Sequence, residues 1–253
     1  MNPAAVPRLS VNVNKVATLR NSRGGNVPSV IDAVRVCIAA GSPGITVHPR
    51  ADARHITLAD VREIAAELAL RRGAVEYNIE GDPRPDLIDT IKEVRPDQCT
   101  LVPVRPGEIT SQAGWPADTS REGLGGVVRD LQACGIRVSV FVEPEEGPIR
   151  MAADVRADRV ELYTEPFARA FTFGGEAAQQ AFRRYVEAAK LAHSLGVGVN
   201  AGHDLDLENL TVFRTLPHLD EVSIGHALIS HALFAGLDRA VRDYLDVLRG
   251  GRG

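Results

Sequence analysis

The sequence is poor in cysteine and lysine and has no long hydrophobic run. Its cysteines, Cys37, Cys99 and Cys134, are odd in number and lack a paired spacing, which argues against a disulfide framework and a cysteine metal site. Only three lysines occur, so a Schiff-base enzyme would have few candidates for its nucleophile. No stretch approaches the roughly 18 apolar residues of a membrane span, and residues 1–8 lack a signal-peptide core. These absences predict a cytoplasmic protein with free thiols and no membrane partner.

The sequence also lacks a strong excess of positive or of negative charge. The net charge is −4 and the arginines are scattered, which disfavours nucleic-acid binding. Hydrophobic residues make up 44% of the 253 residues and charged residues 25%, so the chain can bury a full core. A length of this size is typical of one α/β barrel domain.

Eight short β-like runs alternate with amphipathic segments along the chain. The runs centre near residues 12, 47, 77, 101, 139, 161, 199 and 223. This rhythm predicts a single (β/α)8 TIM barrel over residues 9–249, after a flexible N-terminus at 1–8. The alternative is a doubly wound open sheet, but no glycine-rich dinucleotide motif follows the first run.

The segments between the runs carry helix signals. Thr57, with Asp60 three residues later, predicts a capped helix start. Helices are expected over 28–40, 57–73, 84–94, 121–134, 145–155, 176–195, 206–215 and 227–249. The connection 104–120 is longer than usual and is a candidate lid, or else a passive loop anchored by Trp115.

Nearly all of the runs end in ionisable or amide side chains, a pattern that predicts a shared active-site mouth. The same-side pairs are His48 with Arg50, Glu76 with Asn78, Asn12 with Asn14, and Glu161 with Tyr163. Carboxyl groups in a confined mouth have raised pKa values, and histidine titrates near neutral pH, so these residues suit acid–base catalysis.

Two zones are suited to anions. The first two runs are followed by the cations Lys15, Arg20, Arg23, Arg50 and Arg54. Near the seventh and eighth runs, Gly202-His203-Asp204 and Gly225-His226 are expected to present backbone N–H groups at helix starts. Two zones predict two phosphorylated substrates.

Metal binding is disfavoured by the histidine pattern. Four histidines fall at or near the ends of runs: His48, His55, His203 and His226. They form no His-x-His pair and no His-Glu-x-x-His motif, so we expect no metal.

Four segments together closely resemble the pyridoxine 5′-phosphate synthase family. They are Asn12 to Gly24, Gly44 to Arg50 with Arg54 to Thr57, Val199 to His203 and Ile224 to Ala227. The resemblance spans residues 9 to 247. It implies a (β/α)8 barrel that condenses 1-deoxy-D-xylulose 5-phosphate with 3-amino-2-oxopropyl phosphate, without metal or organic cofactor, in an octameric assembly.

The resemblance also implies roles for single residues. His48 and Glu76 look like the proton acceptors, His203 like the proton donor and Glu161 like a stabilising carboxylate. The aminoketone phosphate would be held by Asn12, Arg23, Asp204, Gly225 and His226. The deoxyxylulose phosphate would be held by Asn14, Lys15, Arg50, His55 and Thr110.

The chain departs from the family pattern at two places. Many members have Asp-His in place of Asn14-Lys15, and Gly in place of Asp204. Lys15 could still contact a phosphate or hydroxyl group. A carboxylate at position 204 would repel a phosphate unless it points away, so the backbone N–H is the expected contact there.

Two other readings stay open. A sugar-phosphate aldolase or epimerase on the same barrel would need Lys15 as a Schiff base or a bound metal. A catalytically silent phosphate-binding protein is the third reading. The joint presence of His48, Glu76, Glu161 and His203 speaks against it, because a binder needs no such set of acid–base groups.

Overall fold

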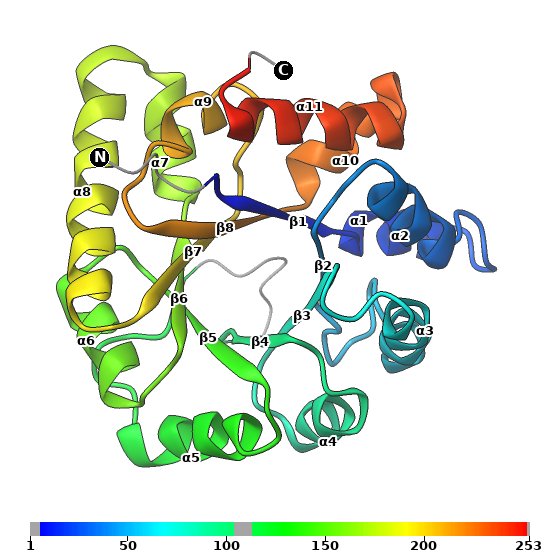
Figure 1. Cartoon of the computed structure of the whole chain (residues 1–253), viewed down its shortest axis with the longest axis horizontal. Helices are drawn as coiled ribbons and strands as arrows, with labels where there is room; N and C mark the ends of the chain where they lie inside the picture. Colours follow the sequence, from blue (N-terminus) through cyan, green and yellow to red (C-terminus); the bar gives the residue numbers. More distant parts are fainter. Residues whose placement is uncertain (1–5, 104–112, 252–253) are drawn as a thin grey trace.

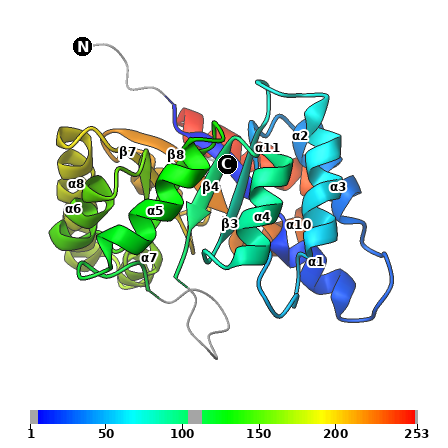
Figure 2. The ribbon, with the colours of Figure 1, turned by 90° about the horizontal axis from the view of Figure 1, so that it is seen from below.

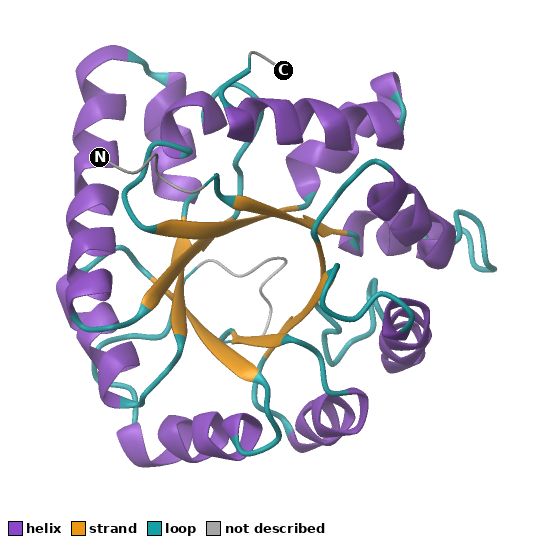
Figure 3. Ribbon diagram, viewed as in Figure 1, coloured by secondary structure: helices purple, strands orange, loops and turns teal. Residues whose placement is uncertain are grey.

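The computed structural model describes residues 6–103 and 113–251. Eight parallel strands close into a barrel in the order β1 to β8, and Figures 1 and 3 show this ring from one end. The strands are β1 (Arg8–Asn12), β2 (Gly44–Val47), β3 (Glu76–Gly81), β4 (Gln98–Leu101), β5 (Arg137–Val142), β6 (Arg159–Tyr163), β7 (Gly198–Gly202) and β8 (Leu219–Ile224). The predicted barrel is therefore confirmed.

Helices surround the ring, and the view turned by 90° shows them flanking the strands (Figure 2). They are α1 (Asn14–Asn21), α2 (Val30–Ala39), α3 (Leu58–Ala69), α4 (Pro85–Val94), α5 (Arg121–Gln132), α6 (Glu146–Asp154), α7 (Glu165–Thr172), α8 (Gly175–Ser194), α9 (Leu210–Phe213), α10 (His226–Ala235) and α11 (Leu237–Arg249). The capping box predicted for α3 is present, with both Thr57 and Asp60 bonded as expected.

The helix predictions needed three corrections. Helices α1 and α7 were missed, because each has only eight residues and directly follows a strand. The segment 206–215 contains only the single turn α9. The segment 227–249 is two helices, α10 and α11, separated at Gly236, whose φ of 83° ends α10.

Side chains alternate between the two faces of the barrel wall. Residues such as Leu9, Val11 and Ile45 point outward and are fully buried in the apolar layer between strands and helices. The inward residues are largely polar. Ser10 Oγ lies 2.6 Å from Thr46 Oγ1, and Thr100 Oγ1 donates to Asn78 Oδ1 at 3.1 Å. A polar barrel interior thus reaches from the middle of the strands to the site above.

Candidate active site

A cavity of about 420 Å³ opens at the carboxyl ends of the strands. This is the end where barrel enzymes place their catalytic groups, because the βα loops meet there. Its lining residues come from most of the strands and from α1: Asn12, Asn14, Lys15, Thr18, His48, Arg50, Arg54, His55, Glu80, Val102, Phe141, Glu161, His203, Asp204, Ser223, Gly225 and His226. Of the thirteen predicted site residues in the described ranges, eleven are therefore brought together, and Glu76 and Arg23 are the exceptions.

Glu76 is not at this mouth, and its predicted placement is wrong. It is the first residue of β3, and its carboxylate pairs with Arg137 and lies 3.6 Å from Arg8 at the opposite end of the barrel. The sequence reading ended the strand near Asn78, but β3 continues to Gly81. At about 3.3 Å per residue, this error moves a side chain by more than 10 Å.

Glu80 takes the place that had been assigned to Glu76. It lies near the end of β3, faces into the barrel and accepts a hydrogen bond from Ser223 Oγ at 3.3 Å. The signal was present in the sequence: the alternation continues through Ile79-Glu80, and Gly81 and Pro83 end the strand. Ser223 and Phe141 also line the cavity without having been predicted.

His48 and Glu80 form the buried centre of the site. His48 Nδ1 lies 3.8 Å from Glu80 Oε2, and both side chains are nearly inaccessible to solvent. Burial, with His55 and the cation Arg50 nearby, lowers the pKa of His48 to about 3. Burial raises the pKa of Glu80. The two groups are therefore not an ion pair at neutral pH, and His48 is a neutral imidazole that can accept a proton.

The second ring nitrogen of His48 is available for such a step. His48 Nε2 is buried and has no hydrogen-bond partner in the described part of the chain. An unsatisfied buried polar atom is costly, and a substrate group would relieve that cost.

Glu161 is a further buried carboxyl group, on β6. Burial and the nearby Glu80 both raise its pKa. The space for it exists because residue 202 is glycine: a Cβ there would overlap the Glu161 carboxylate. Two neighbouring carboxyl groups with raised pKa values can store and release protons near neutral pH.

The cationic side of the cavity is built from α1 and the loop after β2. Asn14 is the first residue of α1, rather than part of a strand, and its Oδ1 accepts a hydrogen bond from the backbone N–H of His48 at 2.9 Å. Lys15 is exposed at the rim, and Arg50 is buried. Burial, with Arg50 and Lys15 nearby, lowers the pKa of His55 to about 4, so this imidazole is neutral.

Two arginines of the predicted anion zone do not line the cavity. Arg20 is held by Asp60, with Nη2 to Oδ2 at 2.9 Å, and so ties α1 to the cap of α3. Arg23 lies exposed in the loop between α1 and α2 and does not reach the cavity within this chain.

The opposite side of the cavity contains a strained turn and a helix start. His203 and Asp204 have φ values of 85° and 55°, unfavourable for residues with a side chain. Thr164 Oγ1 supports the turn by donating to Gly202 O at 2.7 Å. The turn places the His203 ring 5.4 Å from that of Tyr163. Beside this turn, helix α10 begins at His226, and the N–H groups of its first turn lack intrahelical partners.

Asp204 does not face this helix start as an isolated charge. Its Oδ2 lies 3.5 Å from His203 Nδ1. The hydrogen bond from His203 lowers the pKa of Asp204 despite partial burial. The carboxylate is therefore engaged by its neighbour, and a phosphate could approach the backbone N–H groups beside it.

Comparison with known proteins adds a second line of information. The family described as "Pyridoxal phosphate biosynthesis protein PdxJ" matches residues 9–250. The chain belongs to this family.

Curated relatives of this PdxJ family member are nearly the same length. The pyridoxine 5′-phosphate synthase of Bacteroides fragilis is 51% identical over 243 residues, covering 96% of this chain and 99% of the relative. The synthase of Christiangramia forsetii is 49% identical with the same coverage.

Solved structures with a similar fold are far more distant in sequence. A 3-keto-L-gulonate-6-phosphate decarboxylase from Vibrio cholerae has a TM-score of 0.63 at 10% identity, covering 97% of this chain and 99% of that one. A phosphoribosyl anthranilate isomerase from Thermotoga maritima has a TM-score of 0.61 at 13% identity, covering 96% and 99%. These two similarities show the barrel fold alone.

Part of the expected site lies outside the described residues. Thr110 and most of the candidate lid belong to 104–112. At the following segment, Trp115 Nε1 donates to Leu101 O at 2.9 Å, and Trp115 N donates to Phe141 O at 2.9 Å. Trp115 thus fastens this part of the connection to the ends of β4 and β5.

Residues 6–103 and 113–251 contain no group of three His, Cys, Asp or Glu arranged to hold a metal ion. The metal-free site stays a prediction. None of the helices in the same residues is long and apolar enough to cross a membrane.

Proposed function

We propose that this PdxJ family member forms pyridoxine 5′-phosphate from 1-deoxy-D-xylulose 5-phosphate and 3-amino-2-oxopropyl phosphate, releasing phosphate and water. One observation carries the proposal: a single cavity holds a neutral His48, two carboxyl groups with raised pKa values and His203 between two anion-binding sides. Imine formation, dehydration and phosphate loss are successive proton transfers, which require several acid–base groups in one partly dry pocket.

The proton-transfer roles follow from position and pKa. His48 and Glu80 act as proton acceptors, with Glu80 replacing Glu76 in the assignment from the sequence. Glu161 stabilises positive charge that develops on the imine, and His203 donates a proton to a leaving oxygen. His203 is only partly buried and can meet a substrate at the rim.

The two phosphates bind on opposite sides of these groups. Asn14, Lys15, Arg50 and His55 hold the deoxyxylulose phosphate, and Thr110 is retained as a further contact from the sequence prediction. The aminoketone phosphate meets the start of α10 at Gly225 and His226, near Asn12 and the backbone of Asp204. Arg23 could join this side only from another copy of the chain.

The other enzyme reading is less well supported by the site. Lys15 is the one lysine among the described lining residues, and it is exposed at the rim, whereas a Schiff-base lysine is usually desolvated. A silent binder is disfavoured because His48, Glu80 and Glu161 are buried together at a cost in stability.

Several further properties belong to the proposal. The enzyme uses no metal and no organic cofactor, acts on small phosphorylated substrates in the cytoplasm, and assembles as a homo-octamer. The barrel domain comprises residues 9–249.

The deciding experiment mixes chelator-treated protein with both substrates and follows the product by absorbance and mass. We expect product formation that is unaffected by chelator and is reduced at least about 100-fold in His203→Ala, since a lost general acid typically costs that much. A borohydride-trapped adduct on Lys15, or activity only with added metal, would instead support the aldolase or epimerase. Substrate binding without turnover would support the silent binder.

A further inference from the structure

A second polar hollow lies at the opposite end of the barrel. It has a volume of about 420 Å³ and is formed by the loops that precede β3, β4 and β5, together with the start of β1. Four arginines line it, Arg8, Arg72, Arg95 and Arg137, against the two acids Glu76 and Asp97. We propose that this hollow binds a small multivalent anion, of the chemical class of a phosphate or phosphate ester.

Both acids of the hollow are already engaged. Glu76 is buried and shared by Arg8 and Arg137. Asp97 Oδ2 accepts a hydrogen bond from the N–H of Tyr77 at 2.8 Å. An anion entering the hollow therefore meets positive charge that these carboxylates do not fully balance.

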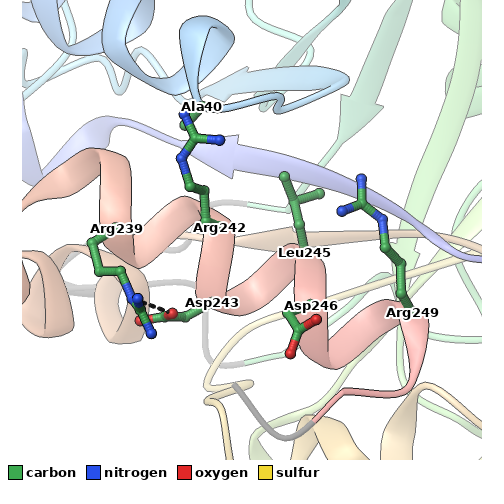
Figure 4. A pocket seen from close by; sticks show the side chains of 7 residues that line it. All are labelled: Ala40, Arg239, Arg242, Asp243, Leu245, Asp246 and Arg249. Carbon is green, nitrogen blue, oxygen red and sulfur yellow. Dashed lines mark ion pairs between the residues drawn. The ribbon is translucent and has the colours of Figure 1, made fainter.

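Two of the arginines have no acid of their own. Arg72 and Arg95 are exposed, and neither guanidinium forms a hydrogen bond or ion pair with any residue in the described ranges. The hollow beside α11 is different. Figure 4 shows Arg239 paired with Asp243, whose Oδ1 lies 2.7 Å from Arg239 Nε. Arg242 Nε lies 2.9 Å from Asp238 Oδ2. Arg239 and Arg242 of the α11 hollow thus have acidic partners within the helix, whereas Arg72 and Arg95 have none in the described residues.

The backbone at Arg95 adds a second observation. Arg95 ends α4 in the left-handed conformation, with φ 47° and ψ 67°, a position that usually favours glycine. An arginine there costs of order 1 kcal/mol relative to glycine. Pro96 follows and restricts the chain further. The strained position directs an exposed guanidinium to the hollow.

Helix dipoles explain only part of this arrangement. Arg72 and Arg95 follow the carboxyl ends of α3 and α4, where a cation is favourable in any protein. That effect does not account for Arg8 and Arg137, which come from strands and converge on the same hollow. The guanidinium fork suits the oxygen atoms of a phosphate, and four such groups can surround one.

The test measures binding of radiolabelled inorganic pyrophosphate to the full chain by equilibrium dialysis at constant ionic strength. We expect two classes of site, one in the catalytic cavity and one in this hollow. The double substitution Arg72→Ala with Arg95→Ala should weaken one class about tenfold or more, because each removes a charge-assisted contact. The same double substitution should leave turnover unchanged.

Two controls distinguish a built site from general positive charge. Arg183→Ala removes an exposed arginine of α8 and should change neither class. Arg72→Lys with Arg95→Lys keeps the charge and should retain part of the affinity. A single class of site in the unmodified protein would overturn the proposal, as would equal weakening by Arg183→Ala or unchanged binding in the double alanine variant. The proposal does not depend on the catalytic activity.

Discussion

His48 Nδ1 and Glu80 Oε2 lie 3.8 Å apart at the ends of the adjacent strands β2 and β3. Burial shifts the two pKa values in opposite directions. The pKa of His48 falls to about 3, and the pKa of Glu80 rises. The shifts keep the two groups from forming a buried ion pair at rest. A substrate proton can be taken up by the neutral imidazole of His48 or by Glu80 in its ionised form.

The exchange of Glu76 for Glu80 gives the first prediction. Glu80→Gln should lower kcat about 100-fold or more, since removing a positioned general base typically costs that much. Glu76→Gln should leave kcat within a few-fold of the unmodified value, because Glu76 lies at the other end of β3. Steady-state kinetics of the two isosteric variants make the comparison.

Glu76→Gln should affect stability. The substitution leaves Arg137 without its charged partner, and hydrogen bonds to charged groups contribute about 1.5–3 kcal/mol. A loss of this order would lower Tm by several degrees in a domain of this size. A collapse of kcat in Glu76→Gln, with Tm unchanged, would return the catalytic role to Glu76.

A second prediction concerns the pH dependence of stability at His48. The folded protein protonates His48 only near pH 3, whereas the unfolded chain does so near 6.5. The stability that the neutral residue contributes is thus present above pH 6.5 and is lost as the pH falls toward 3. Relative to the unmodified protein, His48→Gln should gain about 1.4 kcal/mol of unfolding free energy per pH unit below 6.5.

Glu161→Gln should show the opposite trend. The folded pKa of Glu161 lies above its ordinary value of 4.5, so its contribution is present below 4.5 and is lost as the pH rises through the folded pKa. The glutamine variant should therefore gain relative stability as the pH rises above 4.5. Denaturant unfolding at pH 5, 6, 7 and 8 measures both differences, and parallel curves for the two variants would contradict the assigned burial effects.

Two cations of α1 give a third prediction, because the structure separates their roles. Lys15 lines the cavity, whereas Arg20 is bound by Asp60. Lys15→Met should raise the KM for the deoxyxylulose phosphate about tenfold or more, since a charge-assisted phosphate contact is lost. Arg20→Met should instead lower the free energy of unfolding by about 1.5–3 kcal/mol. Steady-state kinetics and thermal unfolding of both variants make the test. A raised KM in Arg20→Met, or a loss of stability in Lys15→Met, would contradict these two roles.

The sequence predicted the barrel well because its pattern is repeated eight times. Each β-like run contains outward apolar residues and ends in polar groups, and a small error at one run does not change the count. Arg20 was harder to interpret, because no local pattern shows that Asp60, 40 residues away, would bind it. A salt bridge between elements is a property of packing.

The error at Glu76 has a local cause. The run Val75 to Asn78 contains a glutamate flanked by β-forming residues, and the same alternation continues to Glu80. Both glutamates point into the barrel, so periodicity alone cannot decide which one is at the mouth. The pairing register decides it: Gly44 at the start of β2 pairs with Glu76, and Val47 at its end pairs with Ile79.

The glycine at position 202 supports the last prediction. A Cβ at this position would overlap the carboxylate of Glu161 and lie 3.4 Å from the backbone oxygen of Ser223. Gly202→Ala must therefore displace Glu161 or separate β7 from β8. We expect a loss of kcat of about tenfold or more, together with a lower Tm, since overpacking typically costs 1–3 kcal/mol.

Gly126 provides the matched control for this substitution. It lies within α5, and a Cβ there would meet no atom within 4 Å. Gly126→Ala should leave kcat unchanged and should stabilise the protein by up to about 1 kcal/mol, because alanine is the better helix former. If Gly202→Ala behaved like Gly126→Ala in both kinetics and thermal unfolding, the close approach of Glu161 to β7 would not constrain the site. A kinetic loss confined to Gly202→Ala would instead show that the absence of a side chain on β7 keeps the buried carboxyl group in its working position.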